Sequence, residues 1–91
     1  MSNLKNMRVV ITGASSGFGS VTAKLLVAQG CKVTLGARRK DRLEELATEL
    51  GNSSTYEITD VKKKDDLDKL VQKSIDTFDG VDAIINNAGI M

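Results

Sequence analysis

The chain alternates between short runs of β-branched residues and longer segments with helical periodicity, and this alternation most limits the folds open to it. The β-branched runs are expected to form strands, and segments with apolar residues every three or four positions are expected to form helices. The predicted strands cover residues 8–12, 32–37, 55–59 and 82–86. Because a helical segment separates each pair of consecutive strands, the strands are expected to pair in parallel through right-handed crossovers.

Three amphipathic segments connect these strands. The first is expected to end at Gly30, and the second to begin at Asp41, with Glu44 at capping-box spacing, and to end at Gly51. The third is expected to begin at Asp65 and to close at Gly80. The apolar faces predicted for the three helices are Val21, Leu25, Leu26 and Ala28; Leu43, Leu46, Ala47 and Leu50; and Leu67, Leu70, Val71, Ile75 and Phe78.

This element order predicts an α/β fold, a Rossmann-like parallel sheet with strand order 3-2-1-4 and helices on both faces. The 91 residues suffice for one small domain. With no linker or repeat in the sequence, residues 1–91 are expected to form a single half of a doubly wound domain.

Composition excludes several classes of function. The net charge of +1 gives no field that would attract nucleic acid or an anionic membrane, and Lys62-Lys63-Lys64 is interpreted as a solvated loop because no aromatic residue is interleaved with it. No apolar run is long enough to span a bilayer, and the simplest location is the cytoplasm. The absence of histidine argues against a zinc site. The single cysteine, Cys31, is expected to be a small buried residue.

The segment between the first predicted strand and helix is rich in glycine: Gly13, Gly17 and Gly19 fall within seven residues. Backbone N–H groups at such a turn can bind a phosphate, and the dipole of the following helix favours negative charge there. Ser15 and Ser16 can add hydroxyl and backbone hydrogen bonds. The alternative is a tight turn with Ser16 as an ordinary N-cap. Three glycines cost conformational entropy that a plain turn does not require, which favours a pyrophosphate site.

Three motifs then resemble the short-chain dehydrogenase/reductase family over the whole chain. Thr12-Gly13-x-x-x-Gly17-x-Gly19 is similar to its T-G-x-x-x-G-x-G cofactor motif, and Asn86-Asn87-Ala88-Gly89 to its N-N-A-G motif. Asp60-Val61 resembles the pair that contacts adenine. The resemblance implies a nicotinamide dinucleotide cofactor bound at the carboxyl ends of the strands.

The end of the second strand indicates which dinucleotide binds. An acidic residue there would bind the ribose 2′-OH of NAD, but Ala37 occupies that position. Arg38 resembles the basic residue of the NADP-preferring branch, and Arg39 is a weaker candidate for the same role. Asp41 could be a ribose ligand, but its expected capping position already gives it a structural role. The residues predicted to bind NADP(H), in preference to NAD(H), are Gly13, Ser15, Ser16, Gly17, Phe18, Gly19, Arg38, Arg39, Asp60, Val61, Asn87, Ala88 and Gly89.

No residue of the chain matches the catalytic residues of the family. Its serine and Y-x-x-x-K pair would lie beyond Met91, and Tyr56, the only tyrosine, has Asp60 four residues later. The resemblance therefore implies the NADP(H)-binding portion of an oxidoreductase, without turnover on its own. A non-catalytic dinucleotide-binding or partner-docking module is the alternative, and a flavodoxin-like phosphate-binding domain is a third. The fourth strand would present an open edge to a second copy or to a missing C-terminal half.

Overall fold

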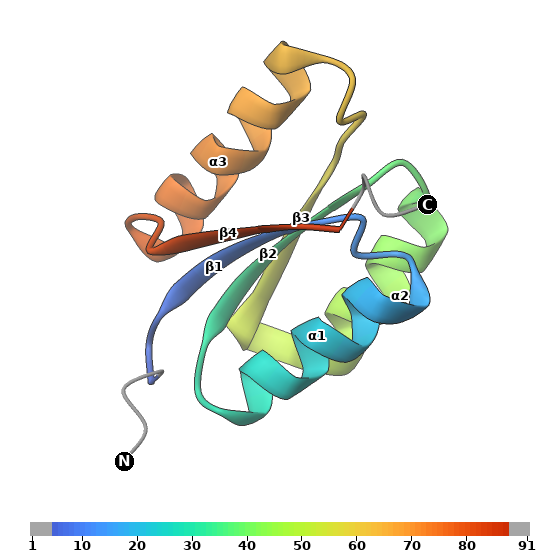
Figure 1. Cartoon of the computed structure of the whole chain (residues 1–91). Helices are drawn as coiled ribbons and strands as arrows, with labels where there is room; N and C mark the ends of the chain where they lie inside the picture. The colour runs from blue at the N-terminus through green and yellow to red at the C-terminus, as the bar shows by residue number, and fades with distance from the viewer. Residues whose placement is uncertain (1–4, 88–91) are drawn as a thin grey trace.

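A computed structural model describes residues 5–87 of the chain. The described residues form one sheet with helices on both sides (Figure 1). In chain order the elements are β1 (Arg8–Thr12), α1 (Gly17–Ala28), β2 (Lys32–Ala37), α2 (Lys40–Leu50), the 3-10 turn η1 (Gly51–Ser53), β3 (Ser54–Ile58), α3 (Lys64–Phe78) and β4 (Ala83–Asn86).

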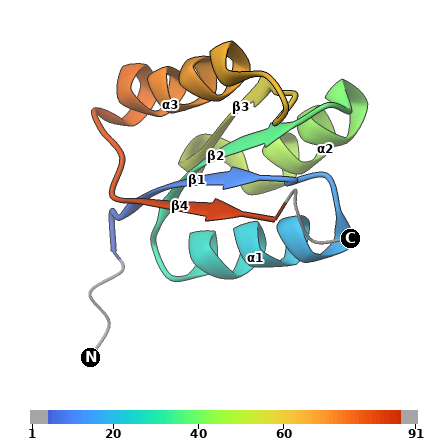
Figure 2. The same ribbon diagram turned by 45° about the horizontal axis from the view of Figure 1, so that its top comes forward.

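The sheet has the strand order predicted from the sequence, β3-β2-β1-β4, and all its pairs are parallel. α3 covers one face of the sheet, and α1 and α2 cover the other (Figure 2). Thr12 pairs with Gly36 on one side and with Asn86 on the other. This register brings the carboxyl ends of the three strands, and the segments that follow them, to one edge of the sheet.

The main core lies between the sheet and the pair α1 and α2. Alternate residues of the two central strands point into it, including Ile11 and Leu35, and Leu43 of α2 packs against them with no exposed surface. On the opposite face Leu70 of α3 closes over Gly36. The central strands are therefore buried on both faces, as is usual for strands inside a parallel sheet, although Thr34 places a buried hydroxyl on the α3 side.

The predicted apolar face of α1 is right at Leu26, which packs against the core, and wrong at its other three residues. Val21 is 54% exposed and Leu25 is 64% exposed, and Ala28 is exposed as well. The buried residues of this helix are Gly19 and Ala23. Gly19 packs so closely against the Gly13 backbone that it has no room for a Cβ atom, and this side of α1 therefore faces the turn. Val21, two positions further along, lies about 200° around the helix axis. The close contact at Gly19 therefore turns Val21 and Leu25 outward.

The predicted start of α2 is also wrong. The helix begins at Lys40 with Arg39 as its N-cap residue, and no side chain caps it. Glu44 pairs with Lys40 at 3.7 Å and does not form a capping box. Because β2 ends at Ala37, only two residues connect it to the helix, which places Asp41 inside the first turn. Leu43 and Leu46 are buried as predicted, and Gly51 ends the helix with a φ of 73°.

The boundaries of the remaining elements differ from the prediction by one or two residues. β3 begins at Ser54, and α3 has Lys63 in place of Asp65 as its N-cap residue. Leu70 is buried on the expected face of α3, but Ile75 is 41% exposed. The C-cap of α3 is Asp79, in the left-handed conformation, followed by Gly80.

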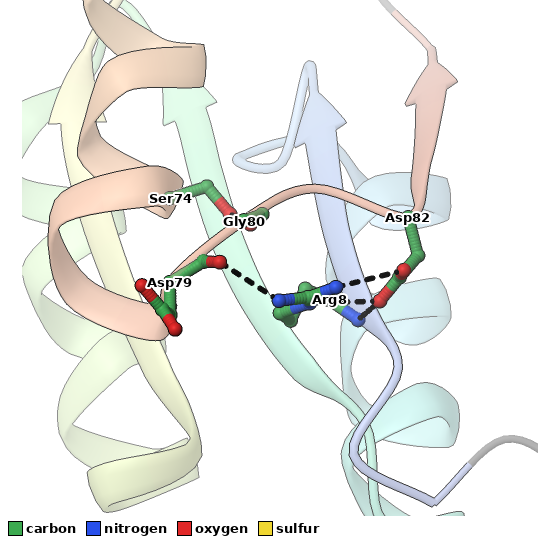
Figure 3. A network of polar contacts seen from close by, with 5 residues as sticks. All are labelled: Arg8, Ser74, Asp79, Gly80 and Asp82. Carbon is green, nitrogen blue, oxygen red and sulfur yellow. Dashed lines mark hydrogen bonds and ion pairs between the residues drawn. The ribbon is translucent and has the colours of Figure 1, made fainter.

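A polar network around Arg8 fixes the end of the sheet opposite the glycine-rich turn (Figure 3). The carboxylate of Asp82 accepts hydrogen bonds from the Arg8 backbone N–H at 2.8 Å and from its Nε at 2.9 Å. Nη1 of Arg8 donates to the Asp79 carbonyl at 2.8 Å, and the Ser74 hydroxyl donates to the Gly80 carbonyl at 2.8 Å. The Asp82 N–H also donates to the Arg8 carbonyl at 2.7 Å, and β4 itself begins at Ala83, one residue later than predicted.

Candidate functional site

The glycine-rich turn lies at the carboxyl end of β1, where its chain passes into α1. Gly13 has a φ of 66°, a conformation that favours glycine. The next residue, Ala14, is fully buried, and its N–H donates to the carbonyl oxygen of Gly36 at 3.1 Å. The turn is thus hydrogen-bonded to the neighbouring strand, and this bond fixes where α1 begins.

Gly17 and Gly19 have different surroundings. A Cβ atom on Gly19 would lie 2.2 Å from the carbonyl oxygen of Gly13, so the fold itself requires glycine there. A Cβ atom on Gly17 would meet nothing within 4 Å. Gly17 is the first residue of α1, so this open space adjoins the helix N-terminus, where backbone N–H groups lack partners within the helix.

The Ser16 hydroxyl is used inside the turn. Its oxygen accepts a hydrogen bond from the Gly19 N–H at 3.1 Å, and its hydrogen is donated to the Gly13 carbonyl at 2.8 Å. Ser16 is the N-cap of α1, as the simpler interpretation of the turn expected. A hydroxyl has one hydrogen to donate, so in this arrangement the Ser16 hydroxyl has none left for a ligand. The Ser16 backbone N–H also donates to the Gly13 carbonyl oxygen, at 3.1 Å. Phe18, the other predicted contact in the turn, is 77% exposed.

A hollow of about 470 Å³ lies between the facing sides of α1 and α2 and reaches the glycine-rich turn. Predicted site residues Ser15 and Arg39 both line it, whereas Arg38 does not. Lys24 of α1 and Glu49 of α2 form an ion pair of 3.1 Å across it. The lining residues are Ala14, Ser15, Ser20, Lys24, Arg39, Asp41, Arg42, Glu45, Leu46 and Glu49.

The two arginines after β2 are both exposed, but they differ in their partners. Nε and Nη2 of Arg39 donate to the two carboxylate oxygens of Asp41, each at 3.3 Å. This hydrogen bonding lowers the pKa of Asp41. Arg38 has no hydrogen bond or ion pair within residues 5–87. The pairing of Asp41 with Arg39 was not predicted from the sequence, because Asp41 was expected to be the helix N-cap; the short connection after Ala37 was the available signal.

Asp60 and Val61 follow β3 at the same edge of the sheet, and both are half-buried. The Asp60 carboxylate accepts a hydrogen bond from the Lys62 N–H at 3.0 Å, and the Asp60 N–H donates to the carboxylate of Asp66 at 2.9 Å. These contacts form the turn into α3. Asp60 therefore has a structural role in this turn, beside the predicted contact with adenine.

The segment after β4 reaches the same edge. The Thr12 hydroxyl donates to the side-chain oxygen of Asn86 at 2.7 Å, so Asn86 ties the end of β4 to the end of β1. The Asn87 N–H donates to the Thr12 carbonyl at 3.3 Å. The Nδ2 of Asn87 is buried without a hydrogen-bond partner among the described residues, so it retains a free donor beside the strand ends. Ala88 and Gly89 lie outside the described residues.

Groups that could act as catalysts are few between residues 5 and 87. Tyr56 of β3 packs against the core. Cys31 is fully buried, and its burial raises the pKa of the thiol. The described part of the chain holds no group of three or more candidate metal ligands, and none of its helices is long and apolar enough to cross a membrane. The edge of the sheet at the carboxyl ends of the strands is therefore a candidate binding surface.

The sequence profile described as short chain dehydrogenase matches residues 7–91. The chain belongs to this family. It is 47% identical over 92 residues to an uncharacterised oxidoreductase of Staphylococcus saprophyticus, and 47% identical over 91 residues to one of Listeria innocua. These alignments cover 100% and 97% of the chain but 37% of each relative.

Solved structures of similar proteins support the same assignment. A 3-ketoacyl-(acyl-carrier-protein) reductase from Brucella melitensis, complexed with NADH, superposes with a TM-score of 0.86 at 34% identity, over 90% of this chain and 34% of that one. A glucose dehydrogenase of Caenorhabditis elegans in its apo form gives a TM-score of 0.89 at 28% identity, over 99% of this chain and 40% of that one. The chain thus corresponds to the N-terminal portion of a short chain dehydrogenase.

Proposed function

We propose that this chain is the NADP(H)-binding portion of an oxidoreductase that moves a hydride between nicotinamide and a carbonyl or hydroxyl carbon. The observation that carries the proposal is the open space at Gly17. The fold requires glycine at position 19, but nothing in the described residues requires it at position 17. A pyrophosphate lying against the N-terminus of α1 would supply the missing reason, because it needs a close approach to the backbone.

The positions around the strand ends agree with this role. Ser15, Asp60 and Asn87 all follow carboxyl ends of strands at one edge of the sheet, where open α/β sheets bind their ligands. The relative solved with NADH shows that a family member with this arrangement takes a nicotinamide dinucleotide. The free Nδ2 donor of Asn87 is suited to an acceptor on the cofactor.

The preference for NADP(H) rests on charge at the end of β2. Ala37, at the position of the acid that would bind a ribose 2′-OH, is buried and carries no charge. Arg38 and Arg39 follow it, and both are exposed. A guanidinium binds phosphate through two charge-assisted hydrogen bonds, which the 2′-OH of NAD cannot reciprocate.

Titration of the purified chain with NADPH and with NADH tests the proposal, after circular dichroism has confirmed that the chain is folded. Saturable binding is expected, with NADPH tighter. The double variant Arg38→Gln, Arg39→Gln should lose the preference for NADPH, whereas Lys40→Gln, which removes the next positive charge along the chain, should keep it. Failure of the folded chain to bind either dinucleotide, or equal binding of both, would contradict the proposal.

A second candidate function, partner docking, is favoured by the exposed edge of the sheet. β4 pairs only with β1 among the described strands, and Ile84 at its centre is 57% exposed. We propose that this edge receives either a further segment of a longer chain or a second copy. Sedimentation of the wild type and of Ile84→Lys distinguishes the cases: self-association that the substitution abolishes identifies a second copy, and a monomeric wild type excludes it.

A further inference from the structure

The pairing of Arg39 with Asp41 bears directly on how the chain tells NADP(H) from NAD(H). Arg39 is the only one of the two predicted phosphate-binding arginines that lines the hollow beside Ser15. Its Nε and Nη2 are both engaged by the carboxylate of Asp41. One of the two positive charges that the proposal assigns to a 2′-phosphate is therefore already paired with a negative one.

Besides Arg39, the carboxylate of Asp41 interacts among the described residues only with the backbone at the start of α2, where the N–H groups of Arg42 and of Asp41 itself also lower its pKa and the helix dipole favours negative charge. Asp41 lies inside the first turn of α2 and is not the helix N-cap, so the capping function expected from the sequence does not apply. Its side chain is 69% exposed, and no other side chain donates a hydrogen bond to it within residues 5–87. The carboxylate faces Arg39 and the hollow.

We propose that Asp41 limits the preference for NADP(H), because its carboxylate competes with the ribose 2′-phosphate for Arg39; this inference rests on the proposed function. A 2′-phosphate that binds Arg39 must either displace the Asp41 carboxylate or bind beside it, where the two negative charges repel each other. NAD(H) carries a neutral hydroxyl at that place and meets neither penalty. Asp41 is thus a residue that sets specificity, acting chiefly through Arg39.

The size of the effect follows from the exposure of the pair. Both side chains are well solvated, with 60% of Arg39 and 69% of Asp41 accessible, so water and salt screen the interaction. Exposed ion pairs of this kind change an equilibrium by about two- to fivefold. Asp41→Asn should therefore raise the ratio of the NADH to the NADPH dissociation constant by about two- to fivefold, and the gain should shrink at high salt.

The experiment measures both dissociation constants by calorimetry for the wild type, Asp41→Asn, Asp41→Glu and Glu44→Gln. Glu44→Gln is the matched control, since it also removes a carboxylate from the start of α2, but one that pairs with Lys40 and does not line the hollow. Glu44→Gln and Asp41→Glu should keep the wild-type ratio. In an Arg39→Gln background Asp41→Asn should no longer tighten NADPH binding.

The outcomes separate this inference from the function on which it rests. A raised ratio in Asp41→Asn alone supports the inference. A ratio that is unchanged or lowered in Asp41→Asn, or raised equally by Glu44→Gln, overturns it while the NADP(H) site stands. A wild type that binds no dinucleotide overturns both. Melting temperatures recorded for every variant show that each is folded when its affinity is measured.

Discussion

Alanine substitutions at Gly17 and at Gly19 should have very different effects on stability. At position 19 the new methyl group would lie 2.2 Å from the Gly13 carbonyl oxygen and 2.7 Å from the Cα of Ala14. Both neighbours are backbone atoms, so the turn itself would have to open by about 1 Å to restore ordinary contact. At position 17 the methyl group meets nothing within 4 Å.

The magnitudes follow from these surroundings. Overpacking against rigid atoms costs about 1–3 kcal/mol or more, and we expect Gly19→Ala at the upper end because no side chain can yield. A 91-residue domain has a free energy of unfolding of only about 5–14 kcal/mol. Gly17→Ala should instead be neutral or stabilise α1 by up to about 1 kcal/mol, since alanine loses less backbone entropy in a helix.

Thermal melting and dinucleotide titration together provide the assay. Each kcal/mol shifts the melting temperature by about 4–8 °C at this size, so Gly19→Ala should melt about 12 °C or more below the wild type. Gly17→Ala should melt at or above the wild-type temperature and yet bind NADPH at least about tenfold more weakly, because its methyl group occupies the path of the pyrophosphate. A Gly17→Ala protein that is stable and binds normally would refute the reasoning about the site.

Two further predictions concern stability alone. The Arg8 side chain and its backbone N–H donate hydrogen bonds that lower the pKa of Asp82 from 3.8 to about 2, so the stabilisation by Asp82 is complete above about pH 4 and is lost as the pH falls toward 2. Asp82→Asn should therefore unfold more readily at neutral pH and show a flatter loss of stability between pH 4 and 2 in denaturant titrations; equal slopes would contradict this. Leu43→Ala should cost about 2–5 kcal/mol because the side chain is fully buried, whereas Leu25→Ala should lie within about 0.5 kcal/mol of the wild type. Comparable losses in the two variants would place Leu25 in the core after all.

The topology could be predicted because it rests on features that repeat along the chain. A helical segment separates each pair of consecutive β-branched runs, and this order favours parallel pairing with right-handed crossovers. Strand limits fell within one residue of those observed, since Gly13, Gly51 and Gly80 each follow or begin a turn. Hydrophobic periodicity and turn-forming glycines are properties of short segments, so they can be recognised without knowing the tertiary structure.

Helix rotation and helix capping could not be predicted in the same way. A helix can carry two apolar stripes, and periodicity does not say which one faces the sheet. In α1 the contact of Gly19 with Gly13 sets the rotation of the helix, and this contact depends on how the turn folds back. In α2 a capping-box spacing at Asp41 and Glu44 was present in the sequence, but the short connection from β2 started the helix earlier.

The sequence predicts where the candidate site lies, but it does not indicate how the roles are distributed among the residues there. The pattern of three glycines does not distinguish the one that the fold requires from the one that leaves room for a ligand. That distinction appears only when a Cβ atom is placed on each backbone position. The same holds for the adjacent arginines, because their exposure is similar and only the partner of Arg39 and its place in the hollow separate them.

The exposed apolar stripe of α1 is a consequence of the site. Gly19 must face Gly13 for Ser16 to cap the helix and for the N–H groups at its N-terminus to open toward the strand ends. Once that rotation is set, Phe18, Val21 and Leu25 point away from the sheet, at 77%, 54% and 64% exposure. Three large apolar residues in solvent are costly for so small a domain. A helix rotated to bury them would bring Gly19 out of the turn and close the space at Gly17. The close turn between Gly13 and Gly19 and the burial of Phe18, Val21 and Leu25 are therefore incompatible. In this fold the turn is kept and the three apolar side chains are exposed.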